Sequence, residues 1–177
     1  MKINSNRLKV VTLLVMAALF LPAVLMAQDS KTNFSGSWIY NAGKSNAGQT
    51  QGQGQRPGQG FGGGDFIANQ VENNLTVERK MRTPDGSEST VISKYTLDGK
   101  ESTNSSRGGD SKSVATWSSD GKKLTIKTTR TMTRDGESRT ITSTELWSLT
   151  DPKTLQIETT RPSPDGERKT TAAYDKK

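Results

Sequence analysis

Polar and apolar residues alternate one by one over much of the chain after residue 70, a period that predicts β-strands rather than helices. Within residues 123–133, Leu124, Ile126 and Met132 share one parity, while the other parity carries only lysine and threonine. Successive side chains of a strand point to opposite faces, so such a segment has one apolar and one solvated face. The same alternation groups Leu75, Val77 and Met81, then Val91, Tyr95 and Leu97, then Ile141, Trp147 and Leu149.

Turn signals stand between these segments, as Asp-Gly pairs and one Asp-Pro pair. Asp-Gly supplies the positive φ that tight hairpins need, so the pattern predicts an antiparallel meander. Pro84 and Pro164 precede two of the pairs, and there they predict three-residue loops with a left-handed glycine. The pairs lie at residues 85–86, 98–99, 120–121, 135–136, 151–152 and 165–166.

The loop lengths set the register between the strands. If the loops at 120–121 and 135–136 have two residues, Trp117 and Trp147 both lie opposite Leu124, and three strands contribute to one apolar layer. A three-residue loop at 134–136 would instead place Leu146 opposite Leu124.

The pattern predicts an all-β fold, an antiparallel up-and-down meander of about eight strands that closes into a barrel. A sandwich of two sheets is the alternative architecture. The expected strands lie near residues 34–41, 70–82, 88–97, 111–118, 122–133, 138–149, 154–162 and 168–174.

The first 27 residues differ from the rest, with three basic side chains, an apolar run over residues 10–21 and a short tail ending at Ala27. This is the layout of a secretory signal peptide, which predicts export to the periplasm or the extracellular space. A membrane anchor is disfavoured, because Thr12 and Pro22 interrupt the run and no basic cluster follows it directly. Residues 28–177 are then expected to form a single domain without a stable membrane anchor.

Composition changes this picture in two ways. Removing the three basic residues of the leader from 25 Lys+Arg leaves 22 against 18 Asp+Glu, so the mature charge falls from +7 to +4. These charges are interspersed, which argues against a nucleic-acid partner.

From Gln28 onward, Leu, Ile, Val and Phe number only 19 of 150 residues, whereas threonine numbers 22. Threonine suits the solvated face of a sheet, so we expect a thin core and one wet face.

A stretch rich in glycine and glutamine, residues 43–64, separates the first expected strand from the second. Such a composition does not repay its ordering entropy, so we expect a disordered loop. Three interpretations remain open: a flexible flap over a barrel mouth, an adhesive segment that contacts other chains, or an inert insertion.

Gly36 and Trp38 open the first strand as Gly-x-Trp. With the hairpin-linked strands that follow, this resembles the lipocalins and the wider calycin barrels, in particular the small exported bacterial proteins described as lipocalin-like. The resemblance implies that Trp38 closes one end of the barrel. It also implies an arginine of the last strands over that tryptophan, with Arg168 the first candidate and Arg161 the second.

Three charged residues have the parity of apolar neighbours: Arg79, Arg130 and Glu145. A buried charge needs a partner, so these groups either bind the polar end of a ligand or form an internal ion-pair network, unless the arginines extend to water at a barrel end. In the ligand interpretation, Arg79 or Arg130 orients an acidic lipophile. The tail of that lipophile would lie along Tyr95, Trp117 and Leu124.

The residue types present favour binding over catalysis. The chain has no cysteine and no histidine, which excludes disulfides and the usual zinc and haem sites. The sequence contains no fixed pair of carboxylates, no serine nucleophile motif and no calcium-loop spacing. We therefore expect no enzyme, cofactor or metal. The prediction is an exported binding protein for a small apolar or amphipathic ligand. The alternative is a filled barrel that acts through its surface, as an interaction partner or a structural module of the cell envelope.

Overall fold

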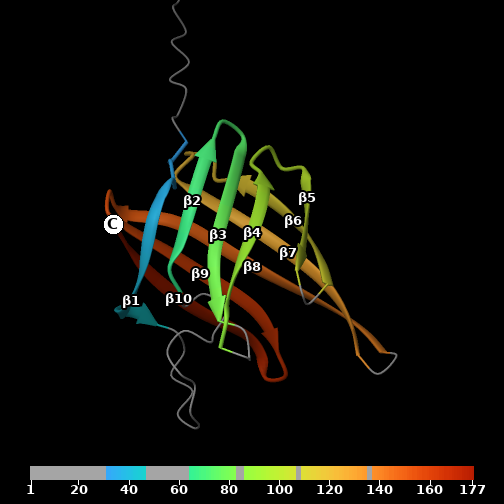
Figure 1. Ribbon diagram of the computed structural model, residues 1–177. Coiled ribbons are helices and arrows are strands. Elements are labelled where there is room, and N and C mark those ends of the chain that lie inside the picture. Colours follow the sequence, from blue (N-terminus) through green and yellow to red (C-terminus); the bar gives the residue numbers. More distant parts are fainter. Residues whose placement is uncertain (1–30, 47–63, 83–85, 107–108, 135–136) are drawn as a thin grey trace, which may run out of the picture.

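The computed structural model describes residues 31–46, 64–82, 86–106, 109–134 and 137–177 (Figure 1). The expected signal segment lies outside the described residues, as do residues 47–63 of the Gly/Gln-rich stretch. The described part forms β1 (Gly36–Asn46), β2 (Phe66–Val71), β3 (Asn74–Arg82), β4 (Glu88–Thr96), β5 (Glu101–Ser106), β6 (Gly109–Trp117), β7 (Lys123–Arg134), β8 (Glu137–Asp151), β9 (Thr154–Ser163) and β10 (Gly166–Lys176).

The strands form one antiparallel sheet in the order β4-β3-β2-β1-β10-β9-β8-β7-β6-β5. Every pair of neighbours except β1 and β10 is consecutive in sequence, so the predicted meander is confirmed and the two-sheet sandwich is wrong. The sheet curls until β4 and β5 lie side by side, which makes a nearly closed barrel (Figure 1). The number of strands is ten rather than about eight.

The two strands missed from sequence are β2 and β5. The segment predicted as one strand over 70–82 contains a hairpin, because the chain turns at Glu72, whose φ is 51°. β5 has the sequence ESTNSS and carries no apolar residue, so periodicity gives no signal for it. Gly43 to Asn46, expected to belong to the loop, continue β1 instead.

The register follows the two-residue alternative on both sides of β7. Trp117 pairs with Leu124, and Leu124 pairs with Trp147, so the pairing of Leu124 with Leu146 is wrong. At the β9–β10 turn, Ser163 pairs directly with Gly166, so a two-residue connection replaces the expected three-residue loop. Gly166 still has a left-handed φ of 112°, while the turn at residues 83–85 lies outside the described part of the chain.

Alternation of burial along the strands defines an inner and an outer face. The fully buried side chains of the core include Trp38, Leu75, Leu124 and Trp147. On the outer face of β7 and β8, threonine hydroxyls face one another across the strands, at 3.2 Å for Thr129 and Thr142 and 3.0 Å for the next pair, Thr131 and Thr140. The expected threonine-rich wet face is therefore present on these strands.

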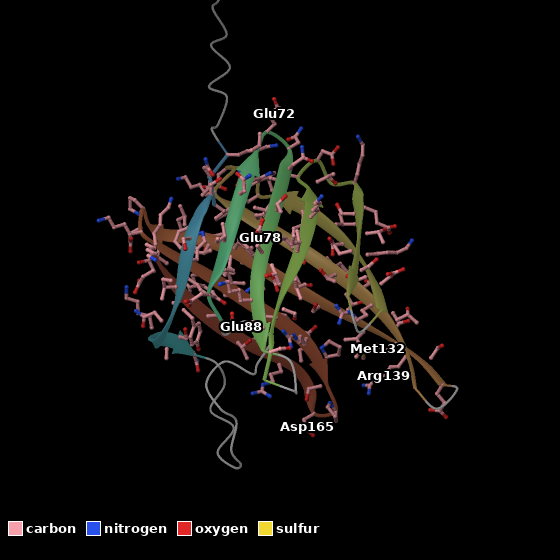
Figure 2. All side chains as sticks on the ribbon, viewed as in Figure 1. Glu72, Glu78, Glu88, Met132, Arg139 and Asp165 are labelled. Atoms are coloured by element: carbon pink, nitrogen blue, oxygen red, sulfur yellow. The ribbon has the colours of Figure 1, made fainter. Side chains whose placement is uncertain are left out.

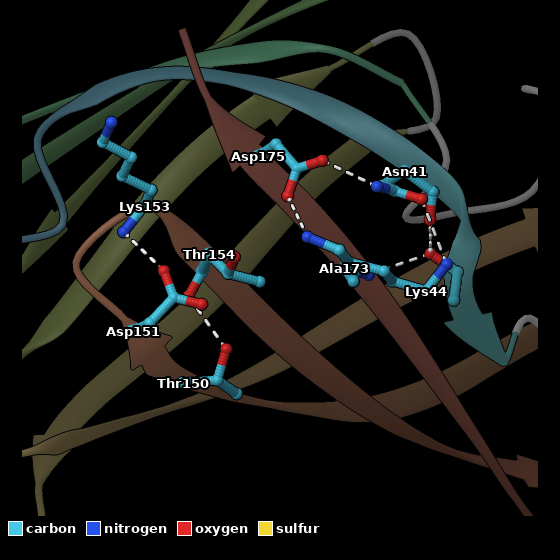
Figure 3. A network of polar contacts seen from close by, with 9 residues as sticks. Asn41, Lys44, Thr150, Asp151, Lys153, Thr154, Ala173 and Asp175 are labelled. Atoms are coloured by element: carbon cyan, nitrogen blue, oxygen red, sulfur yellow. Dashed lines mark hydrogen bonds and ion pairs between the residues drawn. The ribbon is translucent and has the colours of Figure 1, made fainter.

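The second half of β1 is attached to β10 by side chains, because the ladder between the strands shifts register between Asn41 and Asn46. Asn41 Nδ2 donates to Asp175 Oδ2 at 2.6 Å, and Lys44 Nζ lies 2.7 Å from Asp175 Oδ1 (Figure 3). Ser45 Oγ accepts a hydrogen bond from the amide of Ala173 at 2.9 Å. These contacts fix the position at which the Gly/Gln-rich stretch begins.

Side chains also close the seam between β4 and β5. The amide nitrogen of Lys94 donates to Asn104 Oδ1 at 2.7 Å, and Asn104 Nδ2 donates to the carbonyl oxygen of Lys94 at 3.0 Å. Two residues further along each strand, the Thr96 amide donates to Ser102 Oγ at 2.9 Å. The polar composition of β5, which hides it from sequence patterns, thus serves to join the last two edges of the sheet.

Replacing Asn104 with alanine is expected to lower the free energy of unfolding by about 1–2 kcal/mol, because two hydrogen bonds to the Lys94 backbone are lost. Urea unfolding followed by circular dichroism measures the change. The control is Ser105→Ala, at the adjacent exposed position of β5. Equal effects of the two substitutions would show that the side chain of Asn104 does not close the seam.

Candidate ligand-binding site

The inner face has an apolar zone near the start of β1. Trp38 Nε1 donates to the carbonyl oxygen of Phe34 at 2.9 Å, and both side chains are fully buried. The ring of Phe34 stacks on Trp117 with centroids 5.8 Å apart and meets Trp147 edge-on at 5.8 Å. Aromatic contacts of this kind add to the burial of apolar area, so this end of the barrel is firmly packed.

Trp38 is fully buried at this end, but neither of the expected arginines lies over it. Trp38 pairs with Lys176, whose Nζ lies 5.4 Å from the centroid of the tryptophan ring. Arg168 stands eight positions earlier on β10, about 26 Å away at the rise of an extended strand, so its assignment as partner of Trp38 is wrong. Gly36 has a φ of 153°, and a Cβ there would meet Lys176 Cε at 2.6 Å, so the lysine stem occupies the space beside the glycine.

Two of the residues expected to line a lipophile's tail lie in this packed zone. Leu124 is fully buried in the protein core. Trp117 is half-buried, and its Nε1 is a buried donor without a hydrogen-bond partner in the described part of the chain. Since protein side chains surround Leu124, that residue is not a ligand contact, which corrects the expectation from sequence.

A polar zone adjoins the apolar one, centred on Arg79 of β3. The Arg79 guanidinium carbon lies 4.5 Å from the centroid of the Phe66 ring, a cation–π arrangement. The guanidinium also acts on the hydroxyl group of Tyr174 on β10, where it lowers the pKa of the phenol against the larger, opposite effect of burial. Tyr174 meets Phe66 edge-on, with centroids 4.9 Å apart. Arg79 is thus held by an aromatic face and a phenol at the border of the two zones.

Glu145 is the carboxylate of this zone. Its Oε2 accepts a hydrogen bond from Trp147 Nε1 at 2.9 Å, and its charge acts on both Tyr95 and Tyr174. Burial raises the pKa of both phenols above the ordinary value of 10.0, and the charge of Glu145 acts in the same direction. Arg79, Tyr95 and Glu145 were each predicted as inner-face candidates, and the charges of Arg79 and Glu145 both act on Tyr95 and on Tyr174. We call these four residues the inner polar cluster.

Further arginines lie beyond the inner polar cluster. Arg130 of β7 is half-buried and pairs with the buried Ser111 on one side and with Ile141 on the other. Arg161 of β9 is half-buried, and it pairs with the exposed Arg168 of β10. Of the described carboxylates, only Glu145 and Asp175 are not exposed, and Asp175 bonds Lys44 outside the barrel. Among the described residues of the inner face, half-buried arginines therefore outnumber half-buried carboxylates.

Sequence reasoning did not identify Tyr174 and Phe66 as part of the site. Tyr174 has the same parity as Ala172 on β10, a signal that was available. Phe66 follows directly on the Gly/Gln-rich stretch, and its strand was not recognised. In the part of the chain that the structure describes, no group of three acidic side chains gathers as a metal site, and no helix is long and apolar enough to span a membrane.

The chain is similar to one solved structure in particular, the crystal structure of zebrafish ileal bile acid-binding protein complexed with cholic acid. The TM-score is 0.54 at 17% identity, over 81% of this chain and 98% of that chain. No family model and no curated protein matches the chain. At this identity the similarity shows the fold alone. It supports an antiparallel β-barrel fold and leaves the resemblance to the calycins and to bacterial lipocalin-like proteins as a prediction.

The two buried phenols make stability sensitive to alkaline pH. Because the pKa values of Tyr95 and Tyr174 are raised, the folded state keeps protons that the unfolded state loses above pH 10.0. Their contribution is complete below that pH and is lost as the pH rises through the folded pKa values. We therefore expect the urea midpoint to fall as the pH rises above about 10, and to fall less in Tyr95→Phe.

Urea unfolding at a series of pH values measures this difference, and titration of phenolate absorbance in the folded protein gives the pKa shift directly. The lysines titrate in the same range in both proteins, so only the difference between them reports on Tyr95. An equally steep loss of stability in Tyr95→Phe would contradict the assignment of Tyr95 to a buried, protonated state.

Proposed function

We propose that this protein is a non-enzymatic binding protein that holds a small amphipathic molecule against the inner face of its barrel. The observation that carries the proposal is the inner polar cluster beside the apolar zone. Arg79 lies on the Phe66 ring and against the Tyr174 hydroxyl, at the border between aromatic side chains and charged ones. A ligand with an apolar body and a polar end matches such a border.

The charges of the inner face favour an acidic polar end over a basic one. Arg79, Arg130 and Arg161 are half-buried, and Glu145 is the only half-buried carboxylate on this face in the described residues. A guanidinium on an aromatic ring still presents its edge, and that edge accepts a carboxylate in a fork of two hydrogen bonds. The similar structure is that of a protein complexed with cholic acid, which supports a barrel that takes an amphipath.

The proposal places the apolar body of the ligand beside the half-buried Tyr95, away from the sealed end around Trp38 and Leu124. The sealed end supplies rigidity rather than ligand contacts, because its side chains are already in contact with one another.

The proposal also includes export directed by residues 1–27. Fractionation of cells that express the full chain, with sequencing of the mature N-terminus, tests this second part.

Dodecanoate is expected to bind saturably and to change the tryptophan emission, since Trp147 Nε1 bonds Glu145 within the site. Dodecylammonium has the same tail and the opposite charge, and it is expected to bind at least about tenfold more weakly. Arg79→Gln is expected to weaken dodecanoate binding by about tenfold, the effect of losing one charge-assisted contact. Titration by fluorescence, confirmed by calorimetry, measures these affinities.

Lys80→Gln is the matched control, since it removes the same charge at the adjacent residue, which is exposed on the outer face. Its dodecanoate affinity is expected to equal that of the parent protein. If dodecanoate does not bind, or binds equally well in Arg79→Gln, the proposal is wrong and the filled barrel that acts through its surface is favoured.

A further inference from the structure

Three hydroxyl side chains lie in one row across β6, β7 and β8. Ser113 pairs with Thr128 in the ladder between β6 and β7, and Thr128 pairs with Ser143 in the ladder between β7 and β8. Directly opposed residues of antiparallel strands share a face. Ser113 has the parity of the buried Ala115, and Ser143 has the parity of the buried Trp147, so the row lies on the inner face. We call Ser113, Thr128 and Ser143 the hydroxyl row.

The contacts of the hydroxyl row leave hydrogen-bonding capacity unused. Ser113 Oγ and Thr128 Oγ1 lie 2.9 Å apart, and either of them can donate to the other. A hydroxyl group has one proton, so a bond between two hydroxyl groups uses one proton and leaves the second for another acceptor. Ser143 is half-buried, and its hydroxyl group bonds no residue in the part of the chain that the structure describes. The row therefore offers two hydroxyl protons as well as free lone pairs.

Other hydroxyl groups of these strands are satisfied in different ways. Ser111, two residues before Ser113 on β6, donates to the carbonyl oxygen of Asn104 at 3.2 Å. Thr129 and Thr142 form a pair at 3.2 Å on the outer face, where water accepts the remaining proton. The hydroxyl row faces the interior instead, so its remaining protons need acceptors inside the barrel.

The hydroxyl row adjoins the inner polar cluster. Trp147, Glu145 and Ser143 follow one another at alternate positions along the inner face of β8. Ser143 therefore lies on the far side of Glu145 from the sealed end, about 7 Å further along the strand. The charges of Arg79 and Glu145 both act on Tyr95. A ligand that is held at Arg79 and extends away from the sealed end thus passes the hydroxyl row.

The row lies where the barrel opens. Ser143 stands just beyond the end of the ladder between β8 and β9. Beyond Arg130, the last β7 residue that pairs with β6, β7 and β8 continue as a two-stranded arm. Met132, expected from parity to be an inner apolar residue, is 38% exposed on this arm and pairs with Arg139 (Figure 2). Both Thr128 and Ser143 are half-buried, so solvent reaches the row from this side.

We propose that the hydroxyl row binds a hydroxyl group on the body of the ligand, so that the protein selects a hydroxylated fatty acid over an unsubstituted one. This inference rests on the proposed function, which places the acidic end of the ligand at Arg79. The contacts come from the half-buried Thr128 and Ser143, while the buried Ser113 donates to Thr128 and leaves the proton of Thr128 for the ligand.

A ligand hydroxyl group suits the row because it both accepts and donates. It accepts one of the unused protons and donates its own proton to a free lone pair, which replaces the hydrogen bonds to water that it loses on binding. A plain methylene chain in the same place would leave the protons of the row without acceptors, which costs free energy.

Two isomers with one hydroxyl group each test the selection below their micellar concentrations. δ-Hydroxydodecanoate carries the hydroxyl group near the carboxylate, whereas ω-hydroxydodecanoate carries it at the end of the tail. We expect the δ-isomer to bind about fivefold more tightly, the effect of a neutral hydrogen bond. Because the isomers have the same composition, the difference reports the position of the hydroxyl group. Titration calorimetry measures both affinities, with dodecanoate as the reference.

Ser143→Ala removes one hydroxyl group of the row. The preference for the δ-isomer is expected to fall below about twofold, while the affinity for dodecanoate does not decrease. Thr144→Val is the matched control, because it removes a hydroxyl group at the adjacent residue of β8, which has the opposite parity. It should keep the full preference. Without ligand, Ser143→Ala should leave the urea midpoint unchanged, since no hydrogen bond within the described part of the protein is lost.

The outcomes separate the two proposals. If dodecanoate binds in an Arg79-dependent manner but the isomers bind equally, or if Ser143→Ala and Thr144→Val behave alike, the hydroxyl row is not a ligand contact and the proposed function stands. If the Ser143-dependent preference is present but Arg79→Gln does not weaken binding, the hydroxyl row stands and Arg79 is not the site of the acidic end. A lower urea midpoint in ligand-free Ser143→Ala would show that this hydroxyl group is already bonded within the protein, which overturns the inference.

Discussion

Closure of a single antiparallel sheet is the constraint on which the structure depends. Once β1 pairs with β10 and β4 meets β5, each strand has one face toward water and one toward the interior. A charged side chain of inner parity then has to find its partner inside or at an open end. The seam is closed by Asn104 and Ser102 rather than by a regular ladder, so polar side chains of β5 complete the barrel.

The interior meets this constraint differently at its two ends. Near Trp38, aromatic rings pack together, and Lys176 lies over the tryptophan ring. Toward the hairpins at the other end, arginines outnumber carboxylates on the inner face, and the strands separate. This asymmetry gives the barrel a rigid base and a polar end. The proposed ligand contacts, Arg79 and Tyr95, lie on β3 and β4.

The sequence by itself determined the antiparallel meander, the register around β7 and the inner parity of Arg79, Arg130 and Glu145, because side-chain alternation and Asp-Gly turns are local properties. It did not reveal β5, which has no apolar residue, or β2, which lies between glycines and a tight turn. Only the tertiary structure decided which charges meet. The charge of Arg79 on β3 acts on Tyr174 of β10, and Lys176 of the last strand lies over Trp38 of the first. Such contacts depend on how the sheet curls and closes, and no pattern within a single strand contains that information.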